Sequence, residues 1–437
     1  MADMPMTAQV ATDEAIKMTS KRYAPTALGI YMNYLIHGMG VIMISQHQEV
    51  LMAQWGTDLM GISSVISMLG IGRLIAIVAS GPLSDKFGRR PFIKLGMAIY
   101  LIFFLGILLT TNIHVAMACA VVAGLANSCL DSGSYPALME AFPLRAGTAN
   151  VLIKAFVQIG QFILPFMISL LVALDMWFGW TFILVMLALV VNMVYLSRQP
   201  FPDEDMKALA QAQKAQQADS DLANPDADDE VAIKVINPIK HKAQPKMWLE
   251  GTAFILYGFV SQATFYVVSQ YINTYGQATA GLSTSQANQL LSYYSIGSVL
   301  CVAVSAWLAS RVRTVNLVLV YTFASAIAIF LMWQWPTPTI LRIGSFLVGF
   351  FAAGGVMQLG LTVMGQMLPV GKGAITSVFY TFGSIASFTM PMIAGYLAQH
   401  HVAWIMALNF WIAVLGFVLA LIIFIRYYQI IDTDRAN

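Results

Sequence analysis

The sequence predicts an all-α membrane protein with twelve transmembrane helices in two pseudo-symmetric six-helix bundles. Of its 437 residues, 58% are hydrophobic and only 10% are charged, and the mean hydropathy is +0.72. A soluble protein, by contrast, carries charge on about a quarter of its residues. Apolar segments long enough to cross a bilayer recur along the whole chain, and the two halves of the chain share a repeat.

Twelve segments have the length of a membrane span, since about 20 mostly apolar residues cross roughly 30 Å of hydrocarbon. We expect spans at 24–45, 58–81, 91–111, 113–136, 148–172, 178–197, 247–270, 287–309, 314–334, 339–363, 372–396 and 403–426. The first six form an N-terminal bundle over 24–197, and the last six form a C-terminal bundle over 247–426. Residues 1–23 and 427–437 are expected to be cytoplasmic tails.

Lysine and arginine predict the orientation, because cytoplasmic loops collect them. If the first helix runs outward, 21 of the 23 basic residues fall in inner segments, and only Arg73 and Arg342 fall elsewhere, within helices. None falls in the expected outer loops, of which the longest cover 46–57 and 271–286. Both termini are therefore expected in the cytoplasm, with the chain in a bacterial cell membrane.

A polar segment at 198–246 separates the two halves. It holds nine of the 21 acidic residues and a run of glutamine and alanine, a composition typical of a solvated segment. We expect a cytoplasmic linker that lets the two bundles move.

The two halves also share prolines and a glycine in one register. Three positions of the first half recur 226 residues later, as the pairs Pro143 and Pro369, Gly147 and Gly373, and Pro165 and Pro391. Paired halves of this kind build many transport folds. A proline inside a long helix removes a backbone hydrogen bond and marks a place where the helix bends.

The segment between the second and third spans has an unusual composition. It reads Gly81-Pro82-Leu83-Ser84-Asp85-Lys86-Phe87-Gly88-Arg89-Arg90-Pro91. Gly81 is expected to let a neighbouring helix approach closely, as small residues do in membranes. Asp85 can accept charged hydrogen bonds from Arg89, from Arg90 or from a helix N-terminus of the other half.

This segment resembles the signature loop of the major facilitator superfamily in both spacing and position. Together with the twelve spans and the repeat, the resemblance covers essentially the whole chain, and it implies that fold and transport by alternating access. It also implies that the loop latches the two bundles; the gating residues would be Gly81, Asp85, Gly88, Arg89 and Arg90. The alternative, ordinary basic residues in a cytoplasmic loop, explains the arginines but not Asp85 or the glycines.

Two charged residues fall inside predicted spans, where an ionisable side chain costs at least about 2.5 kcal/mol. Counting about 1.5 Å per residue from the outer end places Asp131 roughly 27 Å deep and Arg73 about 21 Å deep. In the implied fold the helices that carry them are neighbours, so an ion pair would offset much of the burial cost. We expect this pair to couple transport to protons, and the alternative is a static ion pair or a snorkelling role.

The residues around Asp131 resemble the fourth helix of the fucose and hexose proton symporters of the same superfamily. The similar run extends from Gly124 to Pro136. Those symporters also carry an acid on the first helix, whereas this chain has Ser45, Gln46 and His47 there. This departure leaves the sugar specificity and the proton pathway open.

Uncharged polar residues in several spans are the candidates for binding a substrate. Amides and phenols donate and accept hydrogen bonds without a fixed charge, which suits a hydroxylated or carboxylated solute. The predicted substrate-binding residues are Asn33, His37, Gln158, Gln262, Tyr266, Gln358 and Tyr380. His37 is also a second candidate for proton coupling. Glu140, Lys154 and Glu250 lie near inner helix ends and are expected to be solvated or adjacent to the gating loop.

The patterns favour a monomeric secondary transporter that moves a small polar organic solute, such as a sugar, a sugar acid or an organic anion, by proton symport. The alternative is proton-coupled efflux of a drug or metabolite, although the fifth span lacks the Gly-Pro and paired-glycine signature usual in antiporters. We expect no enzyme activity, no cofactor and no metal site, since catalytic groups do not cluster and the three cysteines lack metal or redox spacing. Basic residues form no stripe that would bind nucleic acid.

Overall fold

The computed structural model describes residues 6–142, 146–203, 242–308, 311–368 and 372–431. Within these ranges, twelve helical segments are long and apolar enough to span a membrane. Most of the predicted linker (204–241), the end of the predicted C-terminal tail (432–437), and Pro143 and Pro369 of the repeat lie outside the described residues.

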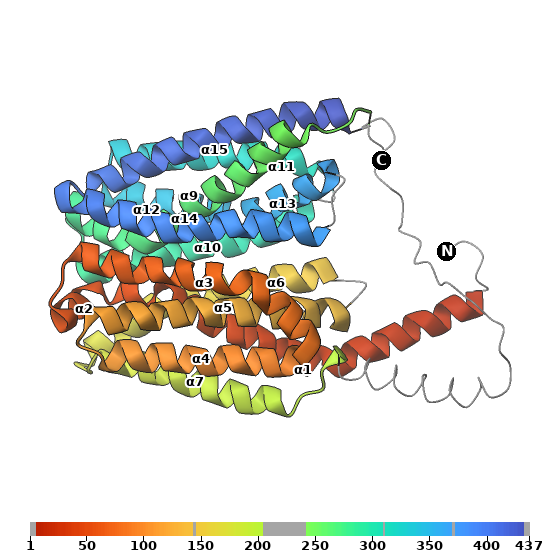
Figure 1. Cartoon of the computed structure of the whole chain (residues 1–437). Helices are drawn as coiled ribbons and strands as arrows, with labels where there is room; N and C mark the ends of the chain where they lie inside the picture. Colours follow the sequence, from red (N-terminus) through yellow and green to blue (C-terminus); the bar gives the residue numbers. More distant parts are fainter. Residues whose placement is uncertain (1–5, 143–145, 204–241, 309–310, 369–371, 432–437) are drawn as a thin grey trace.

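The N-terminal half forms one bundle of helices. Its elements are α1 (Met6–Gln46), α2 (Gln48–Trp55), α3 (Leu59–Phe87), α4 (Arg89–Leu109), α5 (Ile113–Ala141), α6 (Ala146–Ala173) and α7 (Gly179–Ser197). In this bundle α5 packs between α3 and α4, and α1 packs on α6 and α7. α1 extends beyond the bundle toward the N-terminus, because the helix begins at Met6 within the predicted tail (Figure 1).

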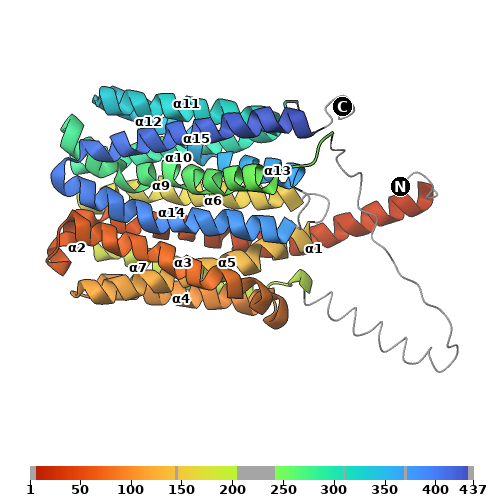
Figure 2. The same ribbon diagram turned by 45° about the horizontal axis from the view of Figure 1, so that its top comes forward.

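The C-terminal half forms a second bundle. Its elements are η2 (Met247–Gly251, a π-helix), α9 (Thr252–Ala280), α10 (Thr284–Leu308), α11 (Thr314–Gln334), α12 (Pro338–Val348), η3 (Gly349–Ala353, a π-helix), α13 (Val356–Met367), α14 (Lys372–His400) and α15 (Ala403–Ile430). The bundles meet along two pairs of helices, α3 with α14 and α6 with α10 (Figures 1 and 2).

The first and last helices define the two ends of the molecule. α1 begins and α15 ends at the same end, here called the terminus side, and the opposite end is called the far side (Figure 1). Three helices that begin on the far side have a polar N-cap, since Asp58, Asn112 and Thr337 each accept a hydrogen bond from the first turn of α3, α5 or α12. These caps explain why the chain turns back into the membrane at those residues.

Two predicted outer loops are partly helical. Residues 46–57 contain α2, whose Leu51 and Trp55 are buried one turn apart against the bundle. The seventh span continues through Ala280, although the sequence predicted a loop from residue 271. Residues 271–276 are polar enough to end a hydropathy segment, yet all of them are buried because they face the other bundle and α10.

The tenth span is interrupted, although the sequence predicted a continuous helix over 339–363. α12 ends in the π-helix η3, and α13 begins only after Gly354 and Gly355. Gly355 has φ +135°, which favours glycine, and Gly349 packs directly on the backbone of α10, leaving no room for a side chain. The break separates the far-side half of this span from the half that carries Gln358.

Candidate functional site

A cavity of about 670 Å³ lies between the two bundles. α1, α3, α5, α6 and the first residue of α4 line it on one side, and α13 and α14 line it on the other. Gly81, Asp85 and Met139 border it, and these residues lie at the terminus-side ends of α3 and α5. The cavity therefore reaches the terminus side.

Hydrogen bonds between the bundles gather on the far side. Asn273 Nδ2 donates to the Ser45 carbonyl oxygen at 2.7 Å, and Thr274 Oγ1 donates to Gln48 Oε1 at 2.9 Å. Further bonds join Gln270 to the Val41 carbonyl, Gln277 and Thr284 to Glu49, Tyr271 to Ser63, and Gln399 to Asp58. These bonds close the far side, so this structure is a conformation open toward the terminus side.

A contact between two glycines positions the central charged pair. Gly72 of α3 and Gly124 of α5 pack so closely that a Cβ atom on either would overlap the backbone of the other helix. Along the same seam, Ser128 Oγ donates to the Arg73 carbonyl at 3.2 Å and Ser132 Oγ donates to Ser80 Oγ at 2.7 Å. This close seam brings the next turns of both helices, with Arg73 and Asp131, side by side.

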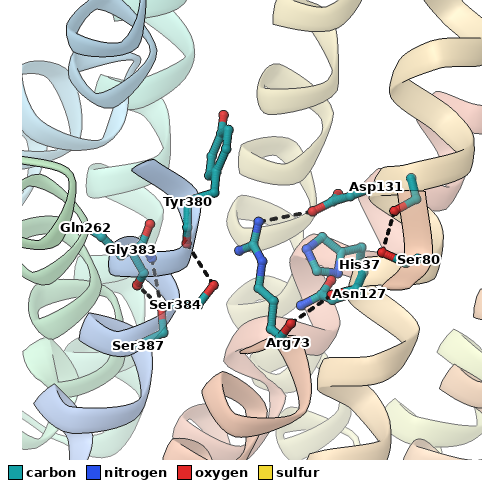
Figure 3. A network of polar contacts seen from close by, with 12 residues as sticks. His37, Arg73, Ser80, Asn127, Asp131, Gln262, Tyr380, Gly383, Ser384 and Ser387 are labelled. Atoms are coloured by element: carbon teal, nitrogen blue, oxygen red, sulfur yellow. Dashed lines mark hydrogen bonds and ion pairs between the residues drawn. The ribbon is translucent and has the colours of Figure 1, made fainter. Parts of the chain in front are cut away.

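Asp131 is held by two donors from two other helices. Arg73 Nη2 lies 3.0 Å from Asp131 Oδ2, and Tyr34 Oη of α1 donates to Asp131 Oδ1 at 2.7 Å. The Arg73 and Asp131 side chains keep 25% and 28% of their surface exposed, so both reach the water of the cavity. The predicted ion pair is therefore present, and Figure 3 shows the Arg73 guanidinium directed at Asp131.

Arg73 also faces the opposite bundle. Its Cζ atom lies 5.9 Å from the centroid of the Tyr380 ring on α14, within the range of a cation–π interaction (Figure 3). Tyr380 and Gln358 of α13 line the cavity, as the sequence predicted. The charged pair of one bundle thus meets uncharged polar groups of the other bundle.

His37 lies on α1 one turn from Tyr34 and lines the same cavity. Its Nδ1 atom is 2.6 Å from Tyr100 Oη, which donates to Asn127 Oδ1 at 3.2 Å. The Tyr34 ring packs edge-on against the His37 ring. Two hydrogen-bonded groups, His37 with Tyr100 and Tyr34 with Asp131, therefore adjoin each other through a ring contact on α1.

Four of the predicted substrate-binding residues do not line the cavity in this conformation. Asn33, Gln158 and Tyr266 are buried among helices, and Gln262 donates to Ser387 of α14 at 3.1 Å. The prediction that Asn33 faces the cavity is wrong for this conformation. Asn33 lies one turn before His37 on the same helix, yet Asn33 is buried while His37 lines the cavity. A substrate role for these four residues stays a prediction.

Lys154 of α6 lines the cavity, whereas the sequence placed it at a solvated helix end. α6 is held against α1 by another pair of glycines, because Gly38 packs on the Val157 backbone and Gly160 packs on the Leu35 backbone. This contact presents Lys154 and Val157 to the cavity. Sequence reasoning also missed Tyr34 and Tyr135, which line the cavity; the signal was their position one turn from His37 and Asp131.

The other two residues expected at helix ends form ion pairs. Glu140 lies 3.0 Å from Arg89 Nη2. Glu250, whose side chain is 1% exposed, lies 2.6 Å from Arg426 Nε and links the start of the C-terminal bundle to its last helix. Glu140 is therefore adjacent to the gating loop, as expected, whereas Glu250 is buried rather than solvated.

The predicted gating loop is well ordered within its own bundle. Arg89 Nη1 lies 2.6 Å from Asp85 Oδ1, the Arg89 backbone N–H donates to Asp203 at 3.0 Å, and Gly88 turns the chain with φ +99°. Arg90 lies over the Phe201 ring. Asp85 is 68% exposed and bonds to no described residue of the C-terminal bundle, so a latch between the bundles is not engaged here.

One prediction about this loop is wrong for this conformation. Gly81 was expected to admit a neighbouring helix, but nothing lies within 4 Å of the place where its Cβ atom would be. The reason is that the bundles are apart on the terminus side, so Gly81 borders the cavity instead.

Comparison with known proteins agrees with this architecture. The family model described as Major Facilitator Superfamily matches residues 27–388 and 277–436. The chain is 45% identical over 405 residues to the inner membrane transport protein YdiM of Escherichia coli (strain K12), covering 92% of this chain and 95% of that protein. It is 36% identical to YdiN of the same organism, with 95% and 93% covered, and 36% identical to the uncharacterized MFS-type transporter YfkL of Bacillus subtilis (strain 168), with 93% and 97% covered.

A solved structure shows the same fold at low sequence identity. The crystal structure of a D-xylose-proton symporter superposes with a TM-score of 0.68 and 15% identity, covering 92% of this chain and 97% of the other. At that identity the likeness describes the fold alone.

Proposed function

This chain belongs to the major facilitator superfamily and is a multi-pass membrane transporter, and from that premise we propose that it imports a small polar organic solute, such as a sugar, a sugar acid or an organic anion, by proton symport. The solute would bind in the central cavity. Lining that cavity are His37, Arg73, Asp131, Gln358 and Tyr380, which include charged, amide and phenol groups.

The observation that carries the proposal is the environment of Asp131. This carboxylate borders the cavity, and each of its oxygens receives one donor, from Arg73 and from Tyr34. Protonation would remove its charge and leave the Arg73 guanidinium without a counter-ion in a membrane interior, where an unpaired charge is costly. Proton binding at Asp131 therefore changes the relative stability of conformations that hold this pair differently.

The predicted orientation describes how the proposed uptake would proceed. If the terminus side is cytoplasmic, as the basic residues indicate, this structure is the inward-open conformation. Opening of the far side would break the bonds of Asn273, Thr274 and their neighbours while the bundles close over the gating loop. Proton and solute would then enter together from outside and leave toward the cytoplasm.

Uptake by purified protein in proteoliposomes tests the proposal. A panel of radiolabelled sugars, sugar acids and organic acids is offered with and without an inwardly directed proton gradient. We expect at least one solute to accumulate only with the gradient, and we expect Asp131→Asn to abolish accumulation while exchange of the same solute across the membrane continues. Unchanged accumulation by Asp131→Asn would remove the coupling role of this residue.

The same assay tests the alternative of proton-coupled efflux. An antiporter loads these vesicles when the gradient is reversed, and its substrates would include dyes and other apolar cations. Accumulation that requires a proton gradient directed outward from the vesicle would replace symport with proton-coupled efflux. Entry of the solute only to equal concentrations on both sides, unaffected by either gradient, would show a uniporter.

A further inference from the structure

One charged residue that lines the cavity has no partner in the part of the chain that the structure describes. Five charged residues line the described part of the cavity, and four of them form two ion pairs, Asp131 with Arg73 and Asp85 with Arg89. Arg89 is also paired with Glu140, which does not line the cavity. The fifth is Lys154, whose ammonium forms no hydrogen bond or ion pair with any described residue, so its positive charge lacks a direct counter-ion.

The position of Lys154 makes that charge available to a solute. Lys154 lies on the face of α6 that also presents Asn150 and Val157 to the cavity. Arg73 and Asp131 line the same cavity. An ammonium held within a membrane protein is favourable only when something offsets its lost hydration, and a negatively charged ligand does so directly.

The opposite wall of the cavity has a different chemistry. α13 and α14 contribute Gln358, Leu361, Thr362 and Tyr380, which carry no charge. An amide and two hydroxyl groups donate and accept hydrogen bonds with the hydroxyl groups of a solute. One wall thus suits an anionic group, and the other suits hydroxyl groups.

We infer that the substrate is a small hydroxylated monocarboxylate whose carboxylate binds the Lys154 ammonium and whose hydroxyl groups face Gln358, Thr362 and Tyr380. This inference rests on the proposed transport function and narrows its substrate class. A neutral sugar would leave the ammonium uncompensated. A dicarboxylate would place a second negative charge beside Asp131, which already has its counter-ion.

Binding to the full-length protein in detergent tests the inference without requiring transport. The midpoint of thermal unfolding is measured against concentration of D-glucuronate, D-gluconate and L-lactate, since a ligand that binds only the folded protein raises that midpoint. Two matched controls, D-glucuronamide and D-glucose, keep the ring of glucuronate but lack its charge, and D-glucarate carries two charges.

We expect at least one of the three monocarboxylates to stabilise the protein more strongly than the two uncharged controls and than glucarate. Lys154→Gln should weaken binding of that monocarboxylate by at least about tenfold, the usual worth of a charge-assisted hydrogen bond, and should erase its advantage over the uncharged controls. Lys154→Arg retains the charge and should retain the preference. Lys246→Gln, at an exposed lysine outside the cavity, should bind as the parent protein does.

Several results would overturn the inference. They are monocarboxylate binding unchanged in Lys154→Gln, or stabilisation by none of the three monocarboxylates beyond that given by glucuronamide and glucose. If the protein accumulates a neutral sugar with the proton gradient and Lys154→Gln does not change that accumulation, this inference is wrong and the proposed function holds. If a monocarboxylate binds in a Lys154-dependent way but is not accumulated with the proton gradient, the proposed function is wrong and the binding inference holds.

Discussion

Gly70 of α3 offers a direct test that the far side must open during transport. On the far side α3 packs against α14 so closely that a Cβ atom at Gly70 would lie 2.5 Å from the backbone nitrogen of Phe388 and 2.8 Å from its Cα atom. Both contacted atoms are backbone of the other bundle, so no side chain can rotate out of the way. Gly70→Ala should therefore destabilise the closed far side relative to the open one.

The size of the effect follows from the packing. Forcing one extra methyl group into a well-packed interface costs about 1–3 kcal/mol, and a part of that is relieved when the bundles separate there. If all of it is relieved, the population with an open far side increases by roughly 5- to 150-fold. Gly81→Ala on the same helix is the matched control, because the space around Gly81 is empty in this conformation.

The population can be read from the reactivity of a buried cysteine. Ser63 is 0% exposed and accepts a hydrogen bond from Tyr271 of the other bundle, so a Ser63→Cys thiol is shielded until the far side opens. In a background without the three native cysteines, Gly70→Ala should accelerate labelling of this thiol by a membrane-impermeant maleimide by the same factor. An unchanged rate, or an equal acceleration by Gly81→Ala, would refute the reasoning.

Three more predictions concern contacts that hold the structure together. Ser169 and Ser285 lie on opposite bundles with their hydroxyl oxygens 3.3 Å apart, so a variant with cysteine at both positions should form a disulfide. The disulfide should stop transport until a reducing agent breaks it, and transport by the cross-linked protein contradicts alternating access. Glu250→Gln should lower the midpoint temperature of thermal unfolding, because it breaks a buried ion pair with Arg426 and so costs on the order of 3 kcal/mol. Replacing both residues by leucine should recover part of the loss, and an unchanged midpoint for Glu250→Gln shows that the pair does not stabilise the protein. Hydrogen bonds from the Gly61 backbone N–H and from the side-chain amide of Gln399, which belongs to the other bundle, lower the pKa of Asp58. The contribution of Asp58 to far-side closure is therefore present above the ordinary pKa of 3.8 and is lost as the pH falls through the lowered pKa. Because acid slows every reaction of a thiol with maleimide, the Ser63→Cys labelling rate is compared with and without Asp58→Asn at each pH, and the ratio of the parent rate to the variant rate should rise on acidification; a ratio that does not change with pH contradicts this role of Asp58.

Much of the fold could be predicted because the bilayer imposes one strong rule on the sequence. Every span must satisfy its own backbone and be mostly apolar, so length and hydropathy locate the helices, and twelve were found where twelve were expected. The rule fails where polar residues are buried by protein instead of lipid. Residues 271–280 were read as a loop for that reason, although they extend α9 and hold the far side closed.

The candidate site was predicted less completely, because the sequence does not show how each helix is rotated about its own axis. The ion pair between Arg73 and Asp131 was expected because a charge inside a span needs a partner, and the structure shows it. Which side chains of a helix face the cavity depends instead on how that helix is rotated against its neighbours, and contacts such as that of Gly38 with the Val157 backbone set this rotation for α6. Lys154 therefore faces the cavity, although the sequence placed it at a solvated helix end. Asn33 lies one turn from the cavity-lining His37 but is buried, so helical spacing alone did not predict its position.

Charged and uncharged groups lie on different walls of the cavity, and this arrangement affects how binding of a solute is coupled to the movement of the bundles. Every charged residue that lines the cavity comes from the N-terminal bundle, and the C-terminal bundle contributes uncharged groups such as Gln358 and Tyr380. A solute that carries only a charge would bind one bundle, and it would therefore have no differential affinity for conformations in which the bundles approach each other. A solute with both a charge and hydroxyl groups contacts both walls, and its binding energy favours the conformations that bring the walls together. Under the proposed function, coupling to Asp131 then requires only that such a solute alters the pairing of Arg73, a cation that contacts both the carboxylate and the ring of Tyr380.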